Sequence, residues 1–404
     1  MKKNYSFIKN LYCPKCHKHY DPDQVNHLCE CGSPLLVSYD LKSAARHWKK
    51  EDLKERKSDL WRYHEVLPVK DPDNVVSLGE GMTPLLPLHS LEKKTGLEHL
   101  YIKDEGILPT GTFKARGAAV GISKAKELQV STVAMPTNGN AGAAWSVYGA
   151  RAGIKTVIAM PEDAAKITRN ECLAAGADLY LVKGLISDAG KIIGRSIAQN
   201  GWYDASTLKE PYRIEGKKTM GYEIAEQFNW NVPDVILYPT GGGVGIIGIY
   251  KALLELQELG WIGDKLPRLV AVQAEGCAPI VKAFHEKKKE SEFFPDSSTV
   301  AFGINVPKAL GDFLVLDALY KTEGTAVSVS DQEILEALYE VSTTEGIFTC
   351  PEGASLYAAV KKLTASGFIS SDDHTVMLNT GAGIIYPDTI QKSIPYVELD
   401  ATLE

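Results

Sequence analysis

DVILYPTGGGVGIIG, residues 234–248, reads as a buried β-strand that runs into a glycine-rich loop and then into a helix. An unbroken run of β-branched and aliphatic residues suits a strand that is covered on both faces. Five further segments of this kind end in glycine, proline or asparagine, namely 130–136, 155–161, 177–184, 268–276 and 374–383. Alanine-rich helical stretches lie between several of them. Strands alternating with helices predict an α/β fold in which helices cover both faces of parallel sheets.

The composition is that of an ordinary globular protein. A chain of 404 residues is long for one domain, so more than one structural unit is expected. A formal net charge of −7 argues against nucleic acid as a partner, because phosphate binding needs a basic surface. The opening residues lack the apolar core of a signal peptide, and no run approaches the roughly 18 apolar residues of a membrane span. We therefore expect a cytoplasmic protein that binds neither nucleic acid nor a membrane.

Cys13, Cys16, Cys29 and Cys31 bring four of the seven cysteines into a short N-terminal segment. Two close pairs, each in a turn, have the layout of a zinc ribbon, in which four thiolates hold one tetrahedral ion. The second pair is closer than usual, and one of three nearby histidines could replace a thiolate. Four protein ligands leave no open position for water, so the expected zinc is structural and not catalytic. Four reduced cysteines without metal are the alternative.

The glycine-rich loop after Tyr238 is suited to bind a phosphate. Gly243, Gly245 and Gly248 fit the pattern G-x-G-x-x-G between a strand and a helix, which is the context of a dinucleotide-binding turn. Free N–H groups before a helix bind any phosphate, and the helix dipole assists them. The run TGGG that starts at Thr240 offers more N–H groups than a pyrophosphate turn needs, which favours a compact phosphate monoester. A Rossmann-type dehydrogenase is the alternative on this feature alone.

Residues 109–117, PTGTFKARG, place Lys114 in a turn at the mouth of an apolar helix. A lysine in that position can lose its proton and form an imine, although a solitary one is usually solvated. The stretch resembles the active-site segment P-T-G-S-F-K-x-R-G of the tryptophan-synthase-like (fold type II) pyridoxal-phosphate (PLP) enzymes, with Thr112 in place of Ser. A dehydrogenase leaves this segment unexplained, and a non-enzymatic zinc-ribbon module accounts for only the first 40 residues.

The resemblance implies two doubly wound αβα sandwich domains. A large PLP domain would comprise residues 76–130 and 236–404, and a small PLP domain would comprise residues 131–235. A zinc-ribbon-like segment (1–40) and an exposed helical connector (41–75) would precede them.

The same resemblance implies how the cofactor is held. Lys114 would carry PLP as an imine, Asn140 would bond its 3′-oxygen, and the loop from Thr240 to Gly245 would hold its phosphate. Thr380 would bond the pyridine nitrogen without keeping it protonated, which suits β-elimination or β-replacement. The implied cofactor residues are Lys114, Phe113, Asn140, Thr240, Gly241, Gly242, Gly243, Val244, Gly245 and Thr380.

Within this superfamily, three segments resemble the threonine synthase family: GEGMTPL (79–85), YRIEGKKT (212–219) and EGIF (345–348). This implies a homodimeric carbon–oxygen lyase that converts O-phospho-L-homoserine and water to L-threonine and phosphate. Arg213, helped by Lys217 or Lys218, would bind the phosphate of the substrate. The implied substrate-binding residues are Thr137, Asn138, Ala141, Arg213 and Lys218.

Three positions depart from the family pattern. Ala115 replaces an aspartate, Leu108 replaces an asparagine, and Thr207-Leu208 stand where an Asn-Ser pair precedes the phosphate-binding arginine. The last departure leaves the substrate open. A threonine or serine dehydratase would use the same cofactor without binding a second phosphate. A β-replacement enzyme such as cysteate synthase would keep Arg213 but take sulfite, and an ordinary surface salt bridge is the alternative role for Arg213.

Overall fold

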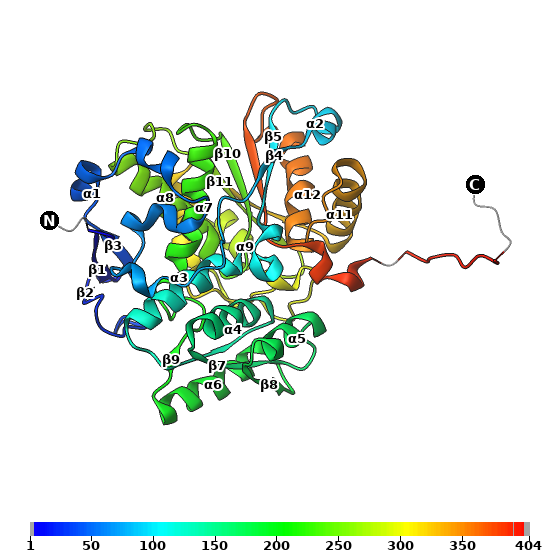
Figure 1. Cartoon of the computed structure of the whole chain (residues 1–404). Coiled ribbons are helices and arrows are strands. Elements are labelled where there is room, and N and C mark those ends of the chain that lie inside the picture. The colour runs from blue at the N-terminus through cyan, green and yellow to red at the C-terminus, as the bar shows by residue number, and fades with distance from the viewer. Residues whose placement is uncertain (1–3, 391, 400–404) are drawn as a thin grey trace.

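Three separate β-sheets organise the described part of the chain, residues 4–390 and 392–399 of a computed structural model (Figure 1). The outer ends of the predicted segments 1–40 and 236–404 lie outside these residues. Near the N-terminus a small antiparallel sheet has the order β2-β1-β3, with β1 (Ile8–Tyr12), β2 (His19–Tyr20) and β3 (Leu36–Tyr39). This sheet frames the segment that carries the four clustered cysteines.

The largest sheet has six strands. Their order is β12 (Thr325–Val329), β11 (Arg268–Ala274), β10 (Val235–Pro239), β13 (Thr375–Asn379), β5 (Leu100–Asp104) and β4 (Leu85–Pro87). Only β4, at one edge, pairs antiparallel; the other neighbours are parallel. The predicted α/β fold with parallel sheets is confirmed, and the carboxyl ends of β10, β13 and β5 meet at one edge.

Alternate residues of the central strands pack on opposite sides of this sheet, which explains why the strands read as unbroken apolar runs. Val235 and Leu237 contribute to a core with α2 (His89–Thr95), α11 (Asp331–Glu345) and α12 (Pro351–Ala365). Ile236 and Tyr238 contribute to a second core. That core includes residues of α7 (Arg213–Gln227), α8 (Val244–Glu258), α9 (Pro279–His285) and α10 (Asp312–Lys321).

The third sheet has four parallel strands in the order β8 (Asp178–Val182), β7 (Lys155–Pro161), β6 (Thr132–Pro136) and β9 (Tyr203–Asp204). It lies below the large sheet in Figure 1, together with α4 (Asn140–Ala152), α5 (Lys166–Ala174) and α6 (Ile186–Asn200). Val133 and Met135 pack in a core with Trp145 of α4, whereas Ala134 packs with Ile193 of α6.

Helix α7 connects the two halves, since it packs against both α8 and α3 (Lys114–Glu127). The predicted boundary at residue 235 assigns α7 to the small unit, but its most extensive packing is with α8, which follows β10 of the large sheet. Glycines allow this close approach. A Cβ on Gly248 would lie only 2.9 Å from the backbone nitrogen of Lys218, so a residue with a side chain at this position would force the two helices apart.

The connector of residues 41–75 is not the exposed helix that its charged composition predicts. It forms α1 (Leu41–His47) and three short 3₁₀ turns, and Leu60, Trp61, Val66 and Leu67 are buried in the core that also contains α3 and α4. The apolar residues of the connector therefore hold it against the core that contains residues of α3 and α4. In the described ranges, no helix is long and apolar enough to cross a membrane.

Candidate active site

Lys114 is the first residue of α3, and a pairing between two loops fixes its place. Thr112 forms an isolated antiparallel bridge with Gly381, and the Phe113 N–H donates to the Thr380 carbonyl over 3.1 Å. The turn before the lysine needs positive φ at Thr110 (65°) and Gly111 (59°). The structure therefore brings Lys114 and Thr380 together, as the sequence predicts, although 266 positions separate them.

The amine of Lys114 is buried and makes no ion pair or hydrogen bond with the described residues; its Nζ lies 3.8 Å from the centre of the Phe113 ring. Burial lowers the pKa of Lys114 to about 8, because the low-dielectric surroundings disfavour the charged form. Glu352 opposes this shift and Arg213 adds to it. An amine with this pKa is available as a nucleophile near neutral pH.

The glycine-rich loop leaves β10 and enters α8 at Val244, with Gly243 in the left-handed region (φ 78°). The backbone N–H groups of Gly242, Gly243, Val244 and Gly245 have no acceptor among the residues that the structure describes. Such free N–H groups at the start of a helix can bind an anion. The Thr240 hydroxyl donates to the Tyr238 carbonyl over 2.9 Å. A Cβ on Gly241 would lie 2.9 Å from Ile304 Cα, so the loop packs closely against that segment.

The loop after β6 is folded around Thr137, whose hydroxyl accepts hydrogen bonds from the N–H groups of Gly139 (3.0 Å) and Gly142 (3.2 Å). Gly139 has φ 138°, and a Cβ there would lie 2.6 Å from Thr168 Oγ1. Asn138 and Ala141 are half-buried on either side of Asn140. The N-terminus of α4 thus presents its free N–H groups next to Asn140.

Three residues near Lys114 were missed by sequence reasoning: Cys350, Glu352 and Tyr386. Cys350 Sγ lies 3.8 Å from Thr380 Oγ1, and the hydroxyl of Tyr386 accepts a hydrogen bond from Asn140 Nδ2 over 2.8 Å. Glu352 accepts the Gly303 N–H with one oxygen over 2.7 Å, while its other oxygen is buried without a partner. Cys350 and Glu352 lie directly after the EGIF segment, in the run TCPEG. The acid in that run was the one sequence signal that could have drawn attention to them.

Arg213 begins α7 and is 2% exposed, so it is not a surface salt bridge. Its guanidinium donates hydrogen bonds to Thr207 Oγ1 over 3.1 Å and to the Ala205 carbonyl. It also lies 3.5 Å from the Glu210 carboxylate and stacks over the Trp145 ring. Its Nε makes no hydrogen bond. Burial lowers the pKa of Arg213, and Glu210 opposes this. A Cβ on Gly242 would lie 3.5 Å from Thr207, so the anion loop adjoins the arginine.

Lys218 is not part of this site, which corrects the prediction. Its Nζ lies 2.6 Å from Glu215 and 2.8 Å from Glu255, inside a buried cluster between α7 and α8. One residue along a helix turns the side chain by about 100°. Lys217 therefore points the other way, toward α3, where its Nζ lies 5.3 Å from the centre of the Phe113 ring.

Comparison with known proteins agrees with this geometry. A family model described as pyridoxal-phosphate dependent enzyme matches residues 76–381, from the GEGMTPL segment to Gly381. The chain belongs to this family.

Its relatives within the pyridoxal-phosphate dependent family include threonine synthases. The chain is 38% identical to that of Methanocaldococcus jannaschii over 93% of both chains. It is 37% identical to that of Methanosarcina acetivorans over 94% of this chain and 93% of the relative. Among solved structures, the processed threonine deaminase isoform 2 of Solanum lycopersicum has a TM-score of 0.65 at 20% identity, covering 83% of this chain and 85% of that chain. Maize serine racemase has the same TM-score and identity, over 76% of this chain and 92% of that one. These structures show the shared fold.

The residues present fit a PLP cofactor. Polar groups buried without a partner gather around Lys114: the hydroxyls of Thr110, Thr112 and Tyr238, and the free oxygen of Glu352. Buried polar groups are normally hydrogen-bonded, so this concentration indicates a space for a polar ligand. Free N–H groups at the start of α8 and a buried amine of lowered pKa supply a phosphate site and an aldehyde-binding group.

The four N-terminal cysteines meet as predicted. Their Sγ atoms all lie within 4.8 Å of one another, with Cys13 and Cys29 buried and Cys16 and Cys31 exposed. The hydroxyl of Tyr20 donates to Cys29 Sγ over 3.2 Å. Such a cluster has the ligand number and softness that suit a tetrahedral metal ion.

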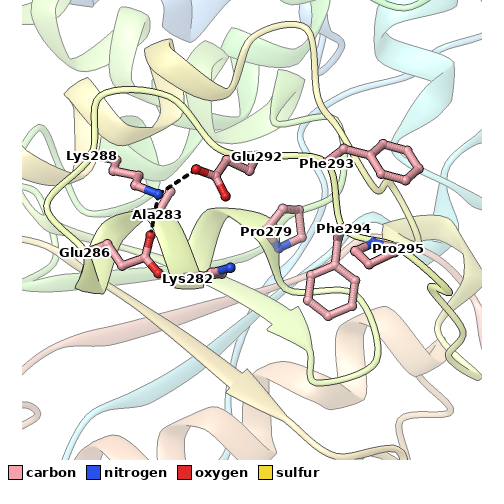
Figure 2. A pocket seen from close by; sticks show the side chains of 9 residues that line it. All are labelled: Pro279, Lys282, Ala283, Glu286, Lys288, Glu292, Phe293, Phe294 and Pro295. Atoms are coloured by element: carbon pink, nitrogen blue, oxygen red, sulfur yellow. Dashed lines mark hydrogen bonds and ion pairs between the residues drawn. The ribbon is translucent and has the colours of Figure 1, made fainter.

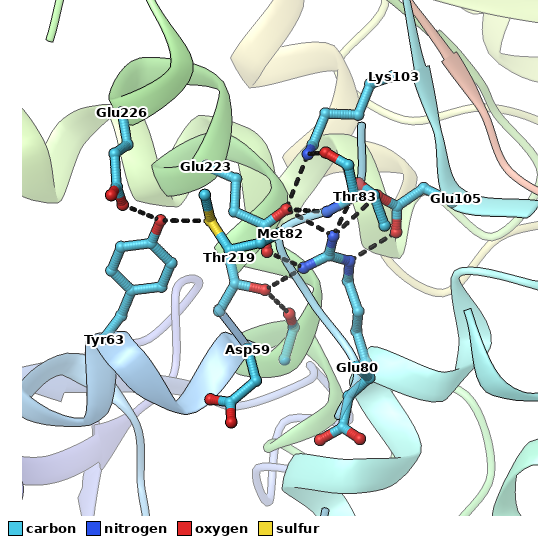
Figure 3. A network of polar contacts seen from close by, with 12 residues as sticks. Asp59, Tyr63, Glu80, Met82, Thr83, Lys103, Glu105, Thr219, Glu223 and Glu226 are labelled. Atoms are coloured by element: carbon cyan, nitrogen blue, oxygen red, sulfur yellow. Dashed lines mark hydrogen bonds and ion pairs between the residues drawn. The ribbon is translucent and has the colours of Figure 1, made fainter. Parts of the chain in front are cut away.

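A fully buried ionic network stands behind the active lysine (Figure 3). Arg116, two residues after Lys114, donates to Glu105 of the segment after β5 and to Glu223 of α7, each over 2.5 Å. Lys103 of β5 donates to Glu223 over 2.8 Å. Thr83 of the GEGMTPL segment donates to Glu105 over 2.7 Å. The network ties α3, α7 and β5 together, and so holds the base of the site.

A hollow beside α9 is lined by residues other than those of this site (Figure 2). It measures about 260 Å³ and is lined by residues of α9 and the following loop, including Lys288, Glu286 and Glu292. Lys288 lies 2.7 Å from both carboxylates, and Lys282 also lines the hollow, so two lysines and two carboxylates occur there together.

Proposed function

We propose that the protein is a threonine synthase that converts O-phospho-L-homoserine and water to L-threonine and phosphate. The similarity to threonine synthases over 93% of the chain supports this. The observation that carries it is the pair Arg213 and Lys217, two buried basic side chains close enough to Lys114 to share its electrostatic surroundings, with Arg213 Nε lacking a hydrogen-bond partner. A dehydratase needs no second phosphate site and so has no use for this pair of cations.

The cofactor residues are proposed as predicted, with two adjustments. Lys114 would hold PLP, the N–H groups from Gly242 to Gly245 would bind its phosphate, and Thr380 would bond its ring nitrogen. Asn140 would bond its 3′-oxygen, and Phe113 would pack against it. Thr240 would shape the loop through its hydroxyl, which donates to the Tyr238 carbonyl, and Gly241 would allow the loop to pack closely against Ile304.

When bound, PLP supplies an electron sink that acidifies the α- and β-protons of an amino acid. Lys114, with a pKa of about 8, can accept and return those protons near neutral pH. The free N–H groups around Asn138 and Ala141 would hold the carboxylate of the substrate, with Thr137 fixing their loop. Arg213 would hold the substrate phosphate, since a guanidinium matches phosphate oxygens.

The departure at Thr207-Leu208 does not remove the phosphate site. Thr207 accepts a hydrogen bond from Arg213 and orients the guanidinium, while Leu208 is buried. Of the two lysines that the sequence offers as helpers of Arg213, Lys217 and not Lys218 would supply the second cation. A sulfite-using β-replacement enzyme would also use these cations, so product analysis must separate the two.

We further propose that Cys13, Cys16, Cys29 and Cys31 hold a structural zinc ion. The closeness of the four Sγ atoms supports this. A cytoplasmic location would keep these thiols reduced. The homodimer implied by the family resemblance stays a prediction.

The test compares two reactions of the PLP-loaded protein. We expect phosphate and L-threonine from O-phospho-L-homoserine, and no 2-oxobutyrate from L-threonine at a comparable rate. Ammonia and 2-oxobutyrate from threonine without phosphate release would contradict the synthase and favour the dehydratase. Added sulfite should leave the product unchanged; its incorporation from a phosphorylated amino acid would favour the other β-replacement enzyme.

A further inference from the structure

Lys217 is a buried lysine without a partner. It is 3% exposed, and among the residues that the structure describes none forms an ion pair or hydrogen bond with its amine. The site makes room for it: a Cβ on Gly117 of the FKARG segment would lie 2.4 Å from Lys217 Nζ. The amine therefore sits against the first turn of α3, on the side where Lys114 begins that helix.

The charges that face Lys217 are mostly positive. Arg213 lies one turn earlier on α7, and Lys114 lies on α3; Glu210, before α7, is the acid that faces it. Glu210 is already committed, because it lies 3.5 Å from Arg213 Nε and accepts the N–H groups of Tyr212 and Arg213. Three basic side chains thus face one carboxylate, so the site can accept an anion.

An unpaired buried amine costs stability, and no described contact compensates for it. A residue of this kind is kept for what it does to a ligand. Burial, Arg213 and Lys114 all lower the pKa of Lys217 well below its ordinary value, so its charged form gives up a proton more readily than that of an exposed lysine.

We propose that Lys217, together with Arg213, binds the phosphate of the substrate and donates the proton with which that phosphate leaves. This rests on the proposed function, since it requires a phosphorylated substrate.

The proton balance closes over one turnover. A bound phosphate dianion favours the charged amine, so Lys217 takes up one proton from water as substrate binds. When the β-proton is removed, the electron pair of that C–H bond forms the β–γ double bond, and the C–O bond breaks with its pair on the oxygen. Lys217 gives its proton to that oxygen, so hydrogen phosphate dianion leaves in place of the trianion. The amine of Lys217 is left uncharged after this transfer.

Arginine cannot take this role, because its pKa is too high for it to give up the proton. Arg213 would therefore stay charged while it holds the phosphate, whereas Lys217 would change its charge during the reaction. General acid catalysis of this kind contributes about 10²–10⁴-fold in rate.

The binding half of the proposal can be measured without turnover. Sulfate is a dianion that does not titrate near neutral pH, and in the PLP-loaded protein the cofactor site is already filled. Calorimetric titration with sulfate at pH 8, repeated in buffers of different ionisation enthalpy, counts the protons taken up. We expect about one proton per sulfate for the unaltered protein and for the exposed control Lys265→Met. Lys217→Arg should bind sulfate with no uptake, and Lys217→Met should bind at least about tenfold more weakly, also without uptake.

Unchanged proton uptake in Lys217→Met would overturn the proposal. In turnover, Lys217→Arg should keep KM for O-phospho-L-homoserine within about threefold and lower kcat by about 10²-fold. A kcat equal to that of the unaltered protein would also overturn it. The cofactor absorbance of each variant reports whether the site has folded. If the unaltered protein released no phosphate from this substrate, the proposed function would fail, and the sulfate titration would still test Lys217 separately.

Discussion

Asn140 Nδ2 donates a hydrogen bond to Tyr386 Oη over 2.8 Å, and this contact joins the start of α4 to the segment that follows β13. The two residues come from the smaller and the larger sheet layers. The contact therefore holds the two sides of the proposed cofactor site at a fixed separation.

Tyr386→Phe removes only this hydroxyl. We expect the free energy of unfolding to fall by about 1 kcal/mol and the affinity for PLP to fall several-fold, because Asn140 loses its orienting partner. Equilibrium denaturation and cofactor titration measure the two effects. Tyr180→Phe, on the exposed edge strand β8, is the matched control. Equal cofactor affinity in Tyr386→Phe and the unaltered protein would show that the contact does not position Asn140.

The rate at which the PLP-free protein takes up its cofactor should depend on pH. Only the uncharged amine of Lys114 can react, so the rate should rise with pH and level off above its pKa of about 8. Glu352 raises this pKa, so Glu352→Gln should move the inflection to lower pH. Stopped-flow absorbance measures the rate. Lys114→Ala should give no lysine-bound chromophore at any pH; a chromophore that persists would remove Lys114 from its role.

Arg116 donates to both Glu105 and Glu223, two of the carboxylates labelled in Figure 3. Removing one partner of a buried ionic cluster leaves uncompensated charge, so Arg116→Met should lower the free energy of unfolding by about 3–5 kcal/mol. Lys321→Met, which removes an exposed ion pair with Asp317, should cost at most about 1 kcal/mol. Urea denaturation of both variants compares them. Similar costs would mean that the network does not hold the two halves together.

Glu223 makes the same network sensitive to acid. Burial alone would raise its pKa, but Arg116 and Lys103 lower it to about 2. A carboxylate whose pKa is lower in the folded than in the unfolded state adds stability above the unfolded value, near 4.3. That stability is lost as the pH falls toward about 2. Glu223→Gln should therefore lower the free energy of unfolding at pH 7 and flatten its dependence on pH between about 4 and 2. Thermal denaturation across this range would detect an unchanged slope, which would contradict the assignment.

The cysteine cluster should hold one metal ion per chain. Cys13→Ser should lower the zinc content measured by atomic emission, whereas Cys277→Ser, a buried cysteine outside the cluster, should not. The segment between the cysteine pairs touches the active-site side of the molecule, because Tyr212 Oη donates to the Pro22 carbonyl over 3.3 Å. Metal removal should therefore raise KM for the phosphorylated substrate through Arg213, the next residue. Full zinc content in Cys13→Ser would contradict a four-thiolate site.

The parts of the site that were predictable from sequence lie in contiguous motifs. The segments that contain Lys114, the glycine loop and the cysteine pairs can each be recognised from fewer than twenty residues of sequence, because local backbone geometry decides their roles. Glu352, Cys350 and Tyr386 were not predictable, since their approach to Lys114 depends on how β13 and α12 pack against a segment more than 200 residues earlier.

The choice between Lys217 and Lys218 shows a different limit. Both are lysines in one motif, and a helix separates neighbours by about 100°, so the phase of α7 decides which one faces the site. That phase is fixed by Glu255 of α8 and by Gly117 of α3, which the motif does not contain. The prediction for the connector (41–75) is wrong for the same reason. Its charged residues predict exposure, whereas Trp61 and Leu67 are buried against residues from other parts of the chain.

Strand β13 lies between β10 and β5 in the middle of the largest sheet, although it is the last strand in the part of the chain that the structure describes. A ribosome must therefore finish nearly the entire protein before the sheet can close, and until then β5 and β10 present unpaired edges. The residue that would bond the cofactor ring, Thr380, follows immediately after this strand. The sheet and the proposed cofactor site would thus both be incomplete until synthesis is nearly finished.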